Sequence, residues 1–397
     1  MGMDAGNGTH GSKKKACRKS ELLFIHKLLT VRVIIVRHTY VITGGYTAGH
    51  VTPGLAIAAS LRVQRPDLEL LFMGAQNGIE ESLVRGDGLA FAGLPAAPWL
   101  GQGFTGKARA LRLLGPSVLI ARRQLRECGA VGLTGLGSFA SVAPGIAAWS
   151  LGLPVTLYES NAQLGLANRL LKPFAKRLLV SSLFESPSPG CDVGVPLHES
   201  LTELAVSPPT ATGELRVLVL GGSLGSPFFN VRLPETLAAL KALTGRSLHI
   251  THQCGHDVDS APIIERYKHQ GVAADIVRFI PALGPQLAAA HIVISTAGAI
   301  SLHELAAAGV PAVISPLPGV AEKHQLANAR AFARVTGSIV YSHHDWQDET
   351  VAKGLANILT DPACWQRHRE GLLRFARPQA TKDFLAAIFR DLPAAAS

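Results

Sequence analysis

Short apolar runs alternate with helical stretches along most of this chain of 397 residues. Runs of this kind are typical of parallel strands that are buried on both faces of a sheet. Two of the runs lead through a glycine-rich turn into a helix, so the same series of alternating strands and helices starts twice along the chain. The pattern predicts an α/β protein with two Rossmann-like, doubly wound domains that face each other across a central cleft. We expect strands at residues 31–43, 68–74, 131–134, 155–159, 177–181, 215–220, 291–295 and 310–315.

The expected domain boundaries follow from the length of the chain and from one polar segment. A chain of this length exceeds a single ordinary domain. Residues 201–213 contain two prolines together with one serine and three threonines, as linkers do. We therefore expect a basic, disordered extension over residues 1–30, a first domain over residues 31–200 and a second over residues 214–378. A C-terminal helix at about 379–397 is expected to pack back on the first domain.

The net charge of +10 indicates a negatively charged partner, because basic proteins bind phosphates, nucleic acids or anionic lipids. Part of the excess lies in the N-terminal extension, and part lies in residues 107–126. This second segment fits the surface of an anionic membrane, although a solvated helix face with a buried stripe explains the segment alone slightly better. We expect no nucleic-acid partner. The apolar members of the segment are Leu111, Leu113, Leu114, Val118, Leu119 and Ile120, and its cations are Lys107, Arg109, Arg112, Arg122, Arg123 and Arg126.

The positions of the cysteines, of the uncharged stretch and of two aspartates argue against several classes of protein. The five cysteines form no CxxC pair, which argues against a disulfide framework or a zinc site and favours a reducing cytosol. Residues 128–158 carry no charge, but glycines and prolines divide them into short elements, so no transmembrane helix is expected. Asp257 and Asp259 resemble a pair of metal ligands, yet acids in a polar loop are mostly solvated. We expect neither a metal ion nor a cofactor.

Two glycine-rich turns are suited to phosphate groups, because glycine lets the backbone approach a ligand closely. The first turn, with Gly44, Gly45, Thr47 and Gly49, precedes a helix that we expect to begin at Pro53. His50 stands just before that helix. It is a candidate general base, or a hydrogen-bond donor to a phosphate group. The second turn is Gly221–Gly222–Ser223, where the hydroxyl of Ser223 is a further donor. Its spacing does not match the dinucleotide fingerprint.

A third candidate site follows the expected strand at residues 291–295. The turn Ala297–Gly298–Ala299 leads into a helix that we expect near Ser301, whose free N–H groups can hold a diphosphate. Glu304, expected in the first turn of this helix, can accept both hydrogen bonds of a ribose diol. The amides of Gln325 and Asn328 can read sugar hydroxyls. An ordinary helix-start acid remains the alternative for Glu304.

Four motifs together resemble the MurG family of peptidoglycan N-acetylglucosaminyltransferases, which belongs to the two-domain GT-B glycosyltransferases. They are TGGYTAGHVTPGLAIA, YESNAQLGLANRLL, VLVLGGSLGS and HQLANA, and the resemblance covers residues 37–390. It implies an inverting transfer of N-acetylglucosamine from UDP-N-acetylglucosamine to the C4 hydroxyl of lipid I, a polyprenyl-diphosphate-linked acceptor, which gives lipid II. It also implies a peripheral enzyme on the anionic cytoplasmic face of the inner membrane.

The resemblance assigns roles to individual residues. Glu304 would hold the ribose, Phe279 and Ile280 would border the uracil, and Ser223 with the turn at residues 297–299 would take the UDP phosphates. Gln325 and Asn328 would read the sugar. On the acceptor side would lie His50, Asn161 and Asn168. His50 is the candidate base, and Glu159 is a second, weaker candidate.

Several positions depart from the family motifs and leave alternatives open. Relative to GGTGGH, Tyr46 is inserted and Ala48 replaces a glycine, and YESN stands in place of HEQN. Leu224 and Thr296 replace a glutamine and an arginine, and GVPLH replaces GNPVR. The first alternative is a related glycosyltransferase with another lipid or small-molecule acceptor. The second is a weak paralogue that binds UDP-sugar without turnover, and a UDP-N-acetylglucosamine epimerase is less favoured.

Overall fold

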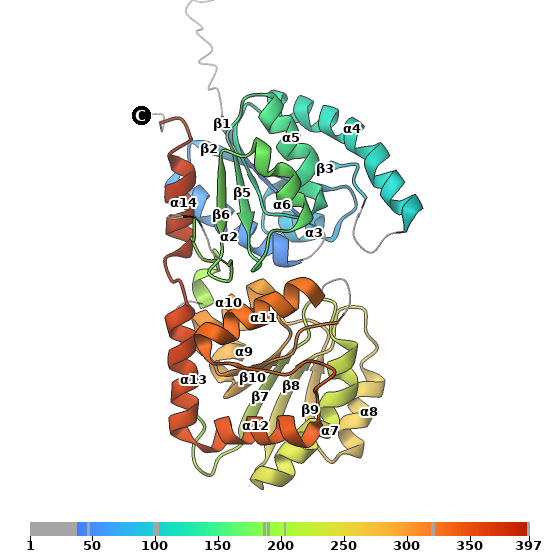
Figure 1. Ribbon diagram of the computed structural model, residues 1–397, viewed down its shortest axis with the longest axis vertical. Coiled ribbons are helices and arrows are strands. Elements are labelled where there is room, and N and C mark those ends of the chain that lie inside the picture. Colours follow the sequence, from blue (N-terminus) through green and yellow to red (C-terminus); the bar gives the residue numbers. More distant parts are fainter. Residues whose placement is uncertain are drawn as a thin grey trace, which may run out of the picture. The chain divides into compact units, whose positions relative to one another are not determined.

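The structure is a computed structural model that describes residues 38–45, 48–97, 103–185, 188, 191–201, 204–318 and 322–394. The expected N-terminal extension, the first part of the expected strand at residues 31–43, and Thr47 lie outside these ranges. The described residues form two parallel sheets of six strands each, with helices on both faces of each sheet (Figure 1). The expected α/β fold class is therefore confirmed.

The first sheet has the strand order β3-β2-β1-β4-β5-β6. The order reverses between β1 and β4, which is the kind of switch point where doubly wound sheets bind ligands. Its strands are β1 (His38–Thr43), β2 (Leu68–Ala75), β3 (Ala90–Leu94), β4 (Ala130–Gly135), β5 (Val155–Glu159) and β6 (Arg177–Val180). The α-helices between them are α2 (Ala48–Gln64), α3 (Ile79–Gly86), α4 (Phe104–Glu127), α5 (Val142–Ser150) and α6 (Leu166–Leu171).

The second sheet repeats this plan with the order β12-β11-β10-β7-β8-β9. Its strands are β7 (Leu215–Leu220), β8 (Leu248–Gln253), β9 (Ala274–Val277), β10 (Ile292–Ser295), β11 (Ala312–Ile314) and β12 (Ile339–Val340). Its helices are α7 (Pro227–Thr244), α8 (Ala261–His269), α9 (Leu283–Ala289), α10 (Ala299–Ala308), α11 (Glu322–Thr336), α12 (Asp348–Thr360) and α13 (Pro362–Phe375). Short 3-10 helices lie at Phe139–Ser141, Lys172–Phe174 and Glu199–Leu201.

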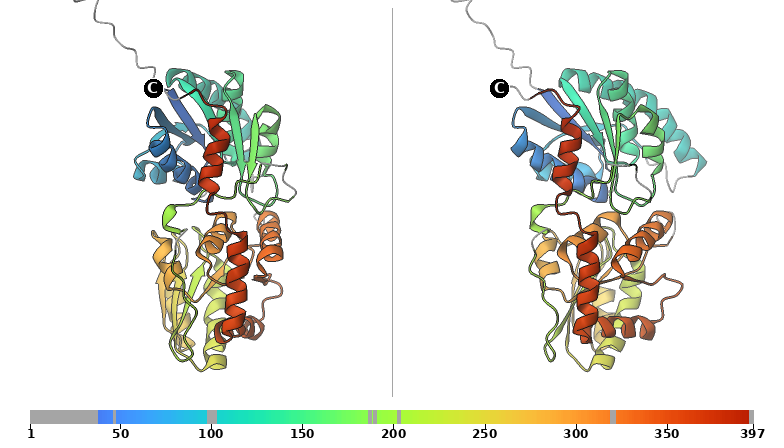
Figure 2. Two further views of the ribbon diagram at one scale, coloured as in Figure 1. Left: turned by 90° about the vertical axis from the view of Figure 1, so that its left-hand side faces the viewer. Right: turned by 60° about the vertical axis from the view of Figure 1, so that its left-hand side comes forward.

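The last helix, α14 (Ala380–Phe389), packs against the first sheet and not the second. Its buried Phe384 contacts the ring of Tyr158 edge-on, with 5.5 Å between ring centroids. Just beyond it, Asp391 binds the guanidinium of Arg177 at 2.5 Å. Figure 2 shows α13 beside the second sheet and α14 beside the first. The end of the chain is thereby fixed to the domain in which the chain begins.

Two helices begin earlier than the sequence pattern predicts. The expectation that a helix starts at Pro53 is wrong, because α2 already contains Gly49 and His50. A proline near a helix start removes one backbone hydrogen bond, which the helix tolerates here. The expectation of a start near Ser301 is also wrong, because the extended Gly298 ends the loop and α10 begins directly after it. Glu304 therefore lies in the second turn of α10 and not in the first.

Within the described residues, no helix is long and apolar enough to cross a bilayer. The longest of them, α4, has 24 residues and carries several arginines.

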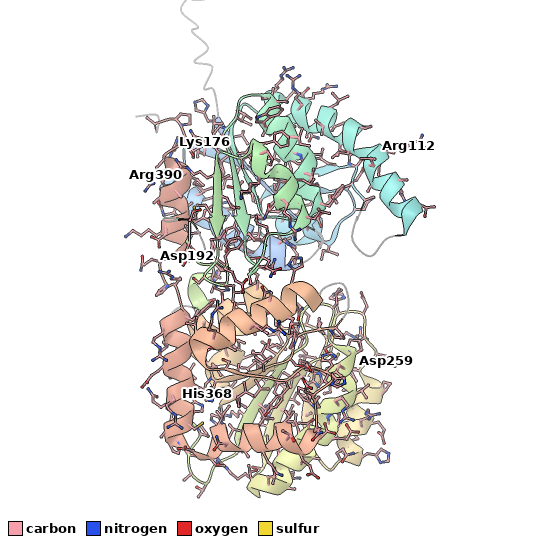
Figure 3. The ribbon with its side chains drawn as sticks, in the orientation of Figure 1. Arg112, Lys176, Asp192, Asp259, His368 and Arg390 are labelled. Carbon is pink, nitrogen blue, oxygen red and sulfur yellow. The ribbon has the colours of Figure 1, made fainter. Side chains whose placement is uncertain are left out.

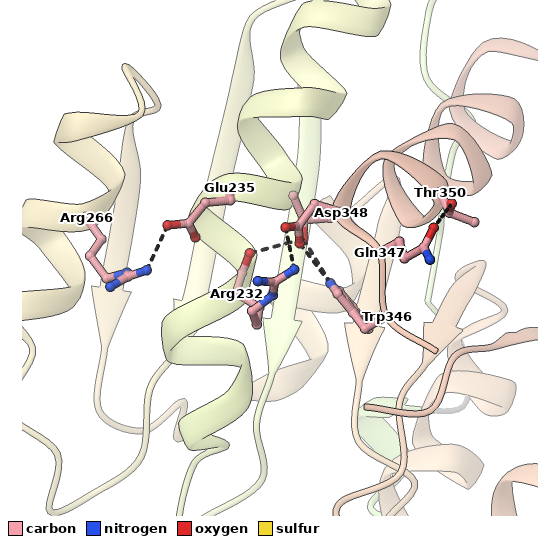
Figure 4. A network of polar contacts seen from close by, with 8 residues as sticks. Arg232, Glu235, Arg266, Trp346, Gln347, Asp348 and Thr350 are labelled. Carbon is pink, nitrogen blue, oxygen red and sulfur yellow. Dashed lines mark hydrogen bonds and ion pairs between the residues drawn. The ribbon is translucent and has the colours of Figure 1, made fainter. Parts of the chain in front are cut away.

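A polar network joins α7 to the start of α12 beneath the second sheet (Figure 4). Asp348 accepts hydrogen bonds from Arg232 at 2.6 Å and from the hydroxyl of Thr236 at 2.6 Å. The indole N–H of the buried Trp346 lies 3.1 Å from both Asp348 and Thr236. One carboxylate on α12 thus satisfies polar groups from α7 and from the loop before α12, which fixes the packing of α12 on α7.

Asp348→Ala should lower the free energy of unfolding by about 2 kcal/mol, because it removes a charge-assisted bond and leaves Arg232 unpaired. The change is measurable as a shift of the urea unfolding midpoint. Glu349→Gln, at the neighbouring exposed position of the same helix turn, is the matched control and should shift it little. Equal midpoints for the Asp348 variant and the wild type would show that the network adds no stability.

Candidate functional site

His50 lies in the first turn of α2, close to three ionisable side chains from other elements. Burial lowers the pKa of His50; the negative charges of Glu159 and Glu80 oppose this effect, and His324 adds to it. The imidazole lies beside Gly137, since a Cβ there would lie at contact distance, 3.5 Å, from its Cδ2 atom. A histidine with a lowered pKa is neutral at physiological pH and can therefore accept a proton.

Glu159 ends β5 and organises the loop that follows it. Among the described residues, its Oε1 atom accepts hydrogen bonds from the backbone N–H of Asn161 at 3.1 Å and from the amide of Asn161 at 2.8 Å. Its Oε2 atom accepts from the N–H of Gly165 and from the amide of Asn168, both at 2.9 Å. The carboxylate is 4% exposed. These four bonds occupy both oxygens and fix the loop between β5 and α6.

Asn168 is fully buried on α6 and lies between Glu159 and the backbone of Tyr158. Its Nδ2 group donates to both, while its Oδ1 atom is a buried acceptor without a hydrogen-bond partner in the described part of the chain. A Cβ atom at Gly137 would lie 3.4 Å from Nδ2 and 3.5 Å from His50. Asn168 and His50 therefore both lie beside Gly137, in the loop after β4.

The side chain of Asn328 joins the two halves of the molecule. Its Oδ1 atom accepts from the N–H of Ala162 at 2.8 Å, and its Nδ2 group donates to the Oδ1 atom of Asn161 at 3.1 Å and to the carbonyl of Ala297 at 3.2 Å. Asn328 lies on α11, and it is 1% exposed. One buried amide thus connects the loop after β5 with the turn after β10, and a sugar can reach it only if these bonds open.

Gln325 stands one helical turn before Asn328 and binds the same turn from the other side. Its Oε1 atom accepts from the N–H of Ala297 at 3.0 Å and from the N–H of Leu317 at 2.9 Å. Both N–H groups belong to loops at the carboxyl ends of neighbouring strands, β10 and β11. The carbonyl oxygen of Gln325 is used within the protein, which leaves its Nε2 group as the part that can reach a ligand.

The start of α10 has the features of an anion site. Gly298, in extended conformation, is the N-cap residue, and within the described residues no side chain caps the helix. The first N–H groups of a helix have no intrahelical partner and lie at its positive end. By contrast, the hydroxyl of Ser226 caps α7, where it accepts from the N–H of Phe229 at 3.3 Å. The start of α10 is therefore the more available of these two helix ends.

The loop of residues 221–226 lies beside this turn, because β7 and β10 are neighbours in the sheet. A Cβ at Gly222 would lie 3.9 Å from the hydroxyl of Thr296, so the two loops approach each other. At Gly225, which has a φ of +76°, a Cβ would overlap the carbonyl of Cys254. Ser223 is partly exposed, and Leu224, at the position of the family glutamine, is 74% exposed. The loop conformation thus requires glycine, and its polar and apolar side chains remain accessible.

Glu304 has a carboxylate with no hydrogen-bond partner in the part of the chain that the structure describes. Burial raises the pKa of Glu304 to about 7. Phe279, which is 44% exposed, and Ile280 lie in the turn between β9 and α9. No hydrogen bond between described residues joins these three side chains to the cluster around Asn328. Because Glu304 is only half-buried, its carboxylate is open to donors from water or from a ligand.

Two further residues beside His50, namely Glu80 and His324, were not singled out by sequence patterns. Glu80 is buried on α3, and the partly buried His324 precedes Gln325 on α11. His324 appears in the HQLANA motif, which gave a weak signal, whereas Glu80 reads as an ordinary acid at a helix start. Their position near His50 arises only from the tertiary structure. Asp257 and Asp259 lie in an exposed loop, where Asp259 accepts from the N–H of Ala261.

Models of the glycosyltransferase family 28 N-terminal and C-terminal domains match residues 40–180 and 216–378. The UDP-N-acetylglucosamine--N-acetylmuramyl-(pentapeptide) pyrophosphoryl-undecaprenol N-acetylglucosamine transferase of Magnetococcus marinus is 34% identical over 350 residues, which is 85% of this chain and 93% of that protein. The chain belongs to the MurG family of glycosyltransferases. A MurG-family relative with the same name from Alcanivorax borkumensis is 38% identical over 314 residues, or 77% of this chain and 85% of that protein. The family resemblance of the four motifs is thereby confirmed.

Solved structures agree on the fold. The crystal structure of Acinetobacter baumannii MurG superposes with a TM-score of 0.71 at 24% identity, covering 89% of this chain and 99% of that one. A putative UDP-N-acetylglucosamine 2-epimerase from Listeria monocytogenes has a TM-score of 0.62 at 10% identity and covers 88% of this chain and 95% of that one. These likenesses show the two-domain GT-B fold that this MurG-family chain was expected to have.

Glu304→Gln should stabilise the protein at pH 8 relative to its effect at pH 5. Because burial raises the pKa of Glu304 from 4.5 to about 7, the group is protonated in both states below about pH 4.5. Between pH 4.5 and 7 it ionises only in the unfolded state, so stability is lost over this range and the loss is complete above about pH 7. The variant lacks this loss, so the gain at pH 8 should be about 1–3 kcal/mol. Thermal unfolding at both pH values measures it.

The matched control for this experiment is Glu370→Gln, at an exposed position of α13. Its effect on the unfolding temperature should be the same at pH 5 and pH 8. If Glu304→Gln behaves like this control, the carboxyl group of Glu304 is not desolvated in the folded protein.

Proposed function

We propose that this protein transfers N-acetylglucosamine from UDP-N-acetylglucosamine, with inversion, to the C4 hydroxyl of lipid I. The relatives that it matches are named for a transfer of this kind. The observation that carries the proposal is the arrangement around Ala297. This residue precedes the uncapped start of α10, and Asn328 hydrogen-bonds its carbonyl while also binding the loop that Glu159 organises near His50.

On the donor side, the first N–H groups of α10 would bind the UDP phosphates, and the hydroxyl of Ser223 would add a donor from the adjacent loop. Ala297, Gly298 and Ala299 would supply this helix start. Glu304 would accept hydrogen bonds from the ribose hydroxyls, which are the donors that its carboxylate lacks in the described structure. Charge that develops on the departing diphosphate would be stabilised by the positive end of the helix.

The remaining contacts to the donor sugar nucleotide would come from exposed or partly buried side chains. Phe279 and Ile280 would border the uracil, since the exposed ring of Phe279 offers an apolar face. The Nε2 group of Gln325 would read the sugar, because its Oε1 atom already binds two backbone N–H groups. Asn328 is better explained as a positioning residue, since all its bonds are made within the protein.

On the acceptor side, His50 is the proposed general base. It would take the proton of the acceptor hydroxyl as that oxygen attacks the anomeric carbon and the bond to the diphosphate breaks. Gly44, Gly45, Thr47 and Gly49 would form the seat of the acceptor diphosphate.

Two further side chains would help to place the acceptor. Asn161 would line this side, and the Oδ1 atom of the fully buried Asn168, which no described donor binds, would reach the acceptor only if the surrounding loop opens. Glu159, with both oxygens occupied, is better explained as a residue that positions Asn161 and Asn168 than as a base.

A lipid-linked acceptor lies in a membrane, so the protein needs a face that contacts the membrane surface. Helices α4 and α5 have such a face. Leu111 and Leu119 on α4 are 63% and 69% exposed, and Trp149 at the end of α5 is 51% exposed. Arg112 projects outward from α4 (Figure 3), and Arg122 reaches across to Ser150 at 3.0 Å. Exposed apolar side chains among cations fit the anionic cytoplasmic face of the inner membrane.

The direct test is an assay with radiolabelled UDP-N-acetylglucosamine and lipid I in detergent or vesicles. A labelled lipid product together with released UDP is the expected result. If UDP is released only with other acceptors, the natural acceptor is a molecule other than lipid I. Nucleotide binding without product would indicate a paralogue without turnover, and neither binding nor product would overturn the proposal.

Glu304→Gln should raise the KM for UDP-N-acetylglucosamine by about 10- to 100-fold, because the amide weakens hydrogen bonds that a charged acceptor makes with the ribose. The kcat at saturating donor should change much less. Glu370→Gln again serves as the control and should keep the wild-type KM. A Glu304 variant with unchanged KM would remove this residue from the donor site.

His50→Ala should lower kcat by about 10²- to 10⁴-fold, the usual contribution of a general base, and leave the donor KM close to that of the wild type. Because burial lowers the pKa of His50, wild-type kcat should also persist below pH 6.5, the ordinary histidine value. Steady-state kinetics between pH 5 and pH 9 test both points. A full loss of kcat at pH 6.5 in the wild type would contradict the lowered pKa.

A further inference from the structure

Glu80 is a buried carboxylate on the acceptor side that the proposed mechanism has not used. It lies in the first turn of α3 and is 0% exposed. Its Oε1 atom accepts a hydrogen bond from the N–H of Ala75 at 2.7 Å. Taking a carboxylate out of water is costly unless its surroundings hydrogen-bond and hold the charged group. The neighbouring Glu81 stays near the surface and pairs with Arg85, so the helix start alone does not explain the burial of Glu80.

Three glycines of the described segments enclose the carboxyl group of Glu80. A Cβ at Gly45 or at Gly78 would overlap its oxygens, and a Cβ at Gly74 would lie 2.8 Å from its Cγ atom. Gly45 follows β1, Gly74 belongs to β2 and Gly78 precedes α3. The backbone of three elements can therefore close around this one side chain only because each contributes a residue without a Cβ.

The glycines around Glu80 are also close to His50. Gly44 and Gly45 continue into the start of α2, and a Cβ at Gly44 would lie 3.3 Å from the carbonyl of His50. The groups that face His50 come from three other elements: Glu80 on α3, Glu159 on β5 and His324 on α11. Glu80 also lies against Gly45 of the glycine segment Gly44–Gly45, whereas none of the printed contacts between described residues joins Glu159 to it.

We propose that Glu80 is a positioning residue of the transfer site, whose buried carboxylate packs against Gly45 before α2 and presents a negative charge to His50. This inference rests on the proposed function, because it assigns to Glu80 the placement of the proposed base. Glu80 itself touches no substrate. It acts through the backbone of the glycine segment and through its charge.

Glu80→Gln separates this role from a purely structural one. The amide oxygen can still accept from Ala75, but the negative charge is lost. Since that charge opposes the effect of burial, its removal should move the titration of His50 to lower pH. Two-dimensional NMR of protein with labelled histidine measures this titration without any substrate, and His50→Gln assigns the signal. The acid limb of the kcat profile should move in the same direction, with kcat about 10- to 100-fold lower and the donor KM unchanged.

Gly45→Ala displaces the carboxylate without removing it and should give a similar loss of kcat. If both variants act through Glu80, their effects should not add in the double variant, because they disturb one contact. The matched controls are Glu81→Gln, the exposed neighbour of Glu80, and Gly86→Ala, where a Cβ meets nothing within 4 Å. Both controls should keep wild-type kcat and His50 titration.

The outcomes distinguish this inference from the function on which it rests. A wild type that transfers no sugar overturns the proposed function, whereas the His50 titration still tests Glu80. An unchanged titration in a folded Glu80→Gln protein overturns the role of Glu80 even if the enzyme is active. Should Glu80→Gln fail to fold, the titration in Gly45→Ala decides the question. There, too, an unchanged signal would overturn the inference.

Discussion

One buried amide, that of Asn328, ties a loop of the first half of this protein to a turn of the second. It binds the loop after β5 through Asn161 and Ala162 and the turn after β10 through Ala297. A primary amide can donate and accept at once, and no apolar or singly charged side chain of this size can do the same. Because the side chain is almost fully buried, an unmade bond would be costly, so the two loops are held in one arrangement.

The glycosyltransferase chemistry that the family performs needs this coupling. In a direct displacement the acceptor oxygen, the anomeric carbon and the leaving diphosphate must lie in line, and errors of about 1 Å are costly. Here the proposed phosphate seat at the start of α10 and the proposed acceptor loop meet at Asn328. Gln325 holds the same turn from the other side, so the sugar would lie between groups that one helix, α11, already fixes.

Sequence patterns predicted the fold well because periodicity and glycine turns are local signals. The strands at Val155–Glu159 and Leu215–Leu220 agree with the structure to the residue. The pattern placed the start of α10 two residues late, since it could not show that Gly298 adopts an extended conformation. It also could not show that the amide of Asn328 makes its hydrogen bonds within the protein, or that Glu80 lies near His50. Those facts depend on which loops meet, and loops from different strands meet only after the sheets have formed.

The surroundings of His50 follow from a balance between desolvation and charge. Burial alone would make the imidazole a weak base, and two buried carboxylates, Glu80 and Glu159, counteract this effect. Each carboxylate is in turn held by backbone N–H groups, Ala75 for Glu80 and both Asn161 and Gly165 for Glu159. The basicity of one side chain therefore depends on the folding of the loops after β1, β2 and β5. A substitution in any of these loops can therefore change the proton affinity of His50 without touching the donor half.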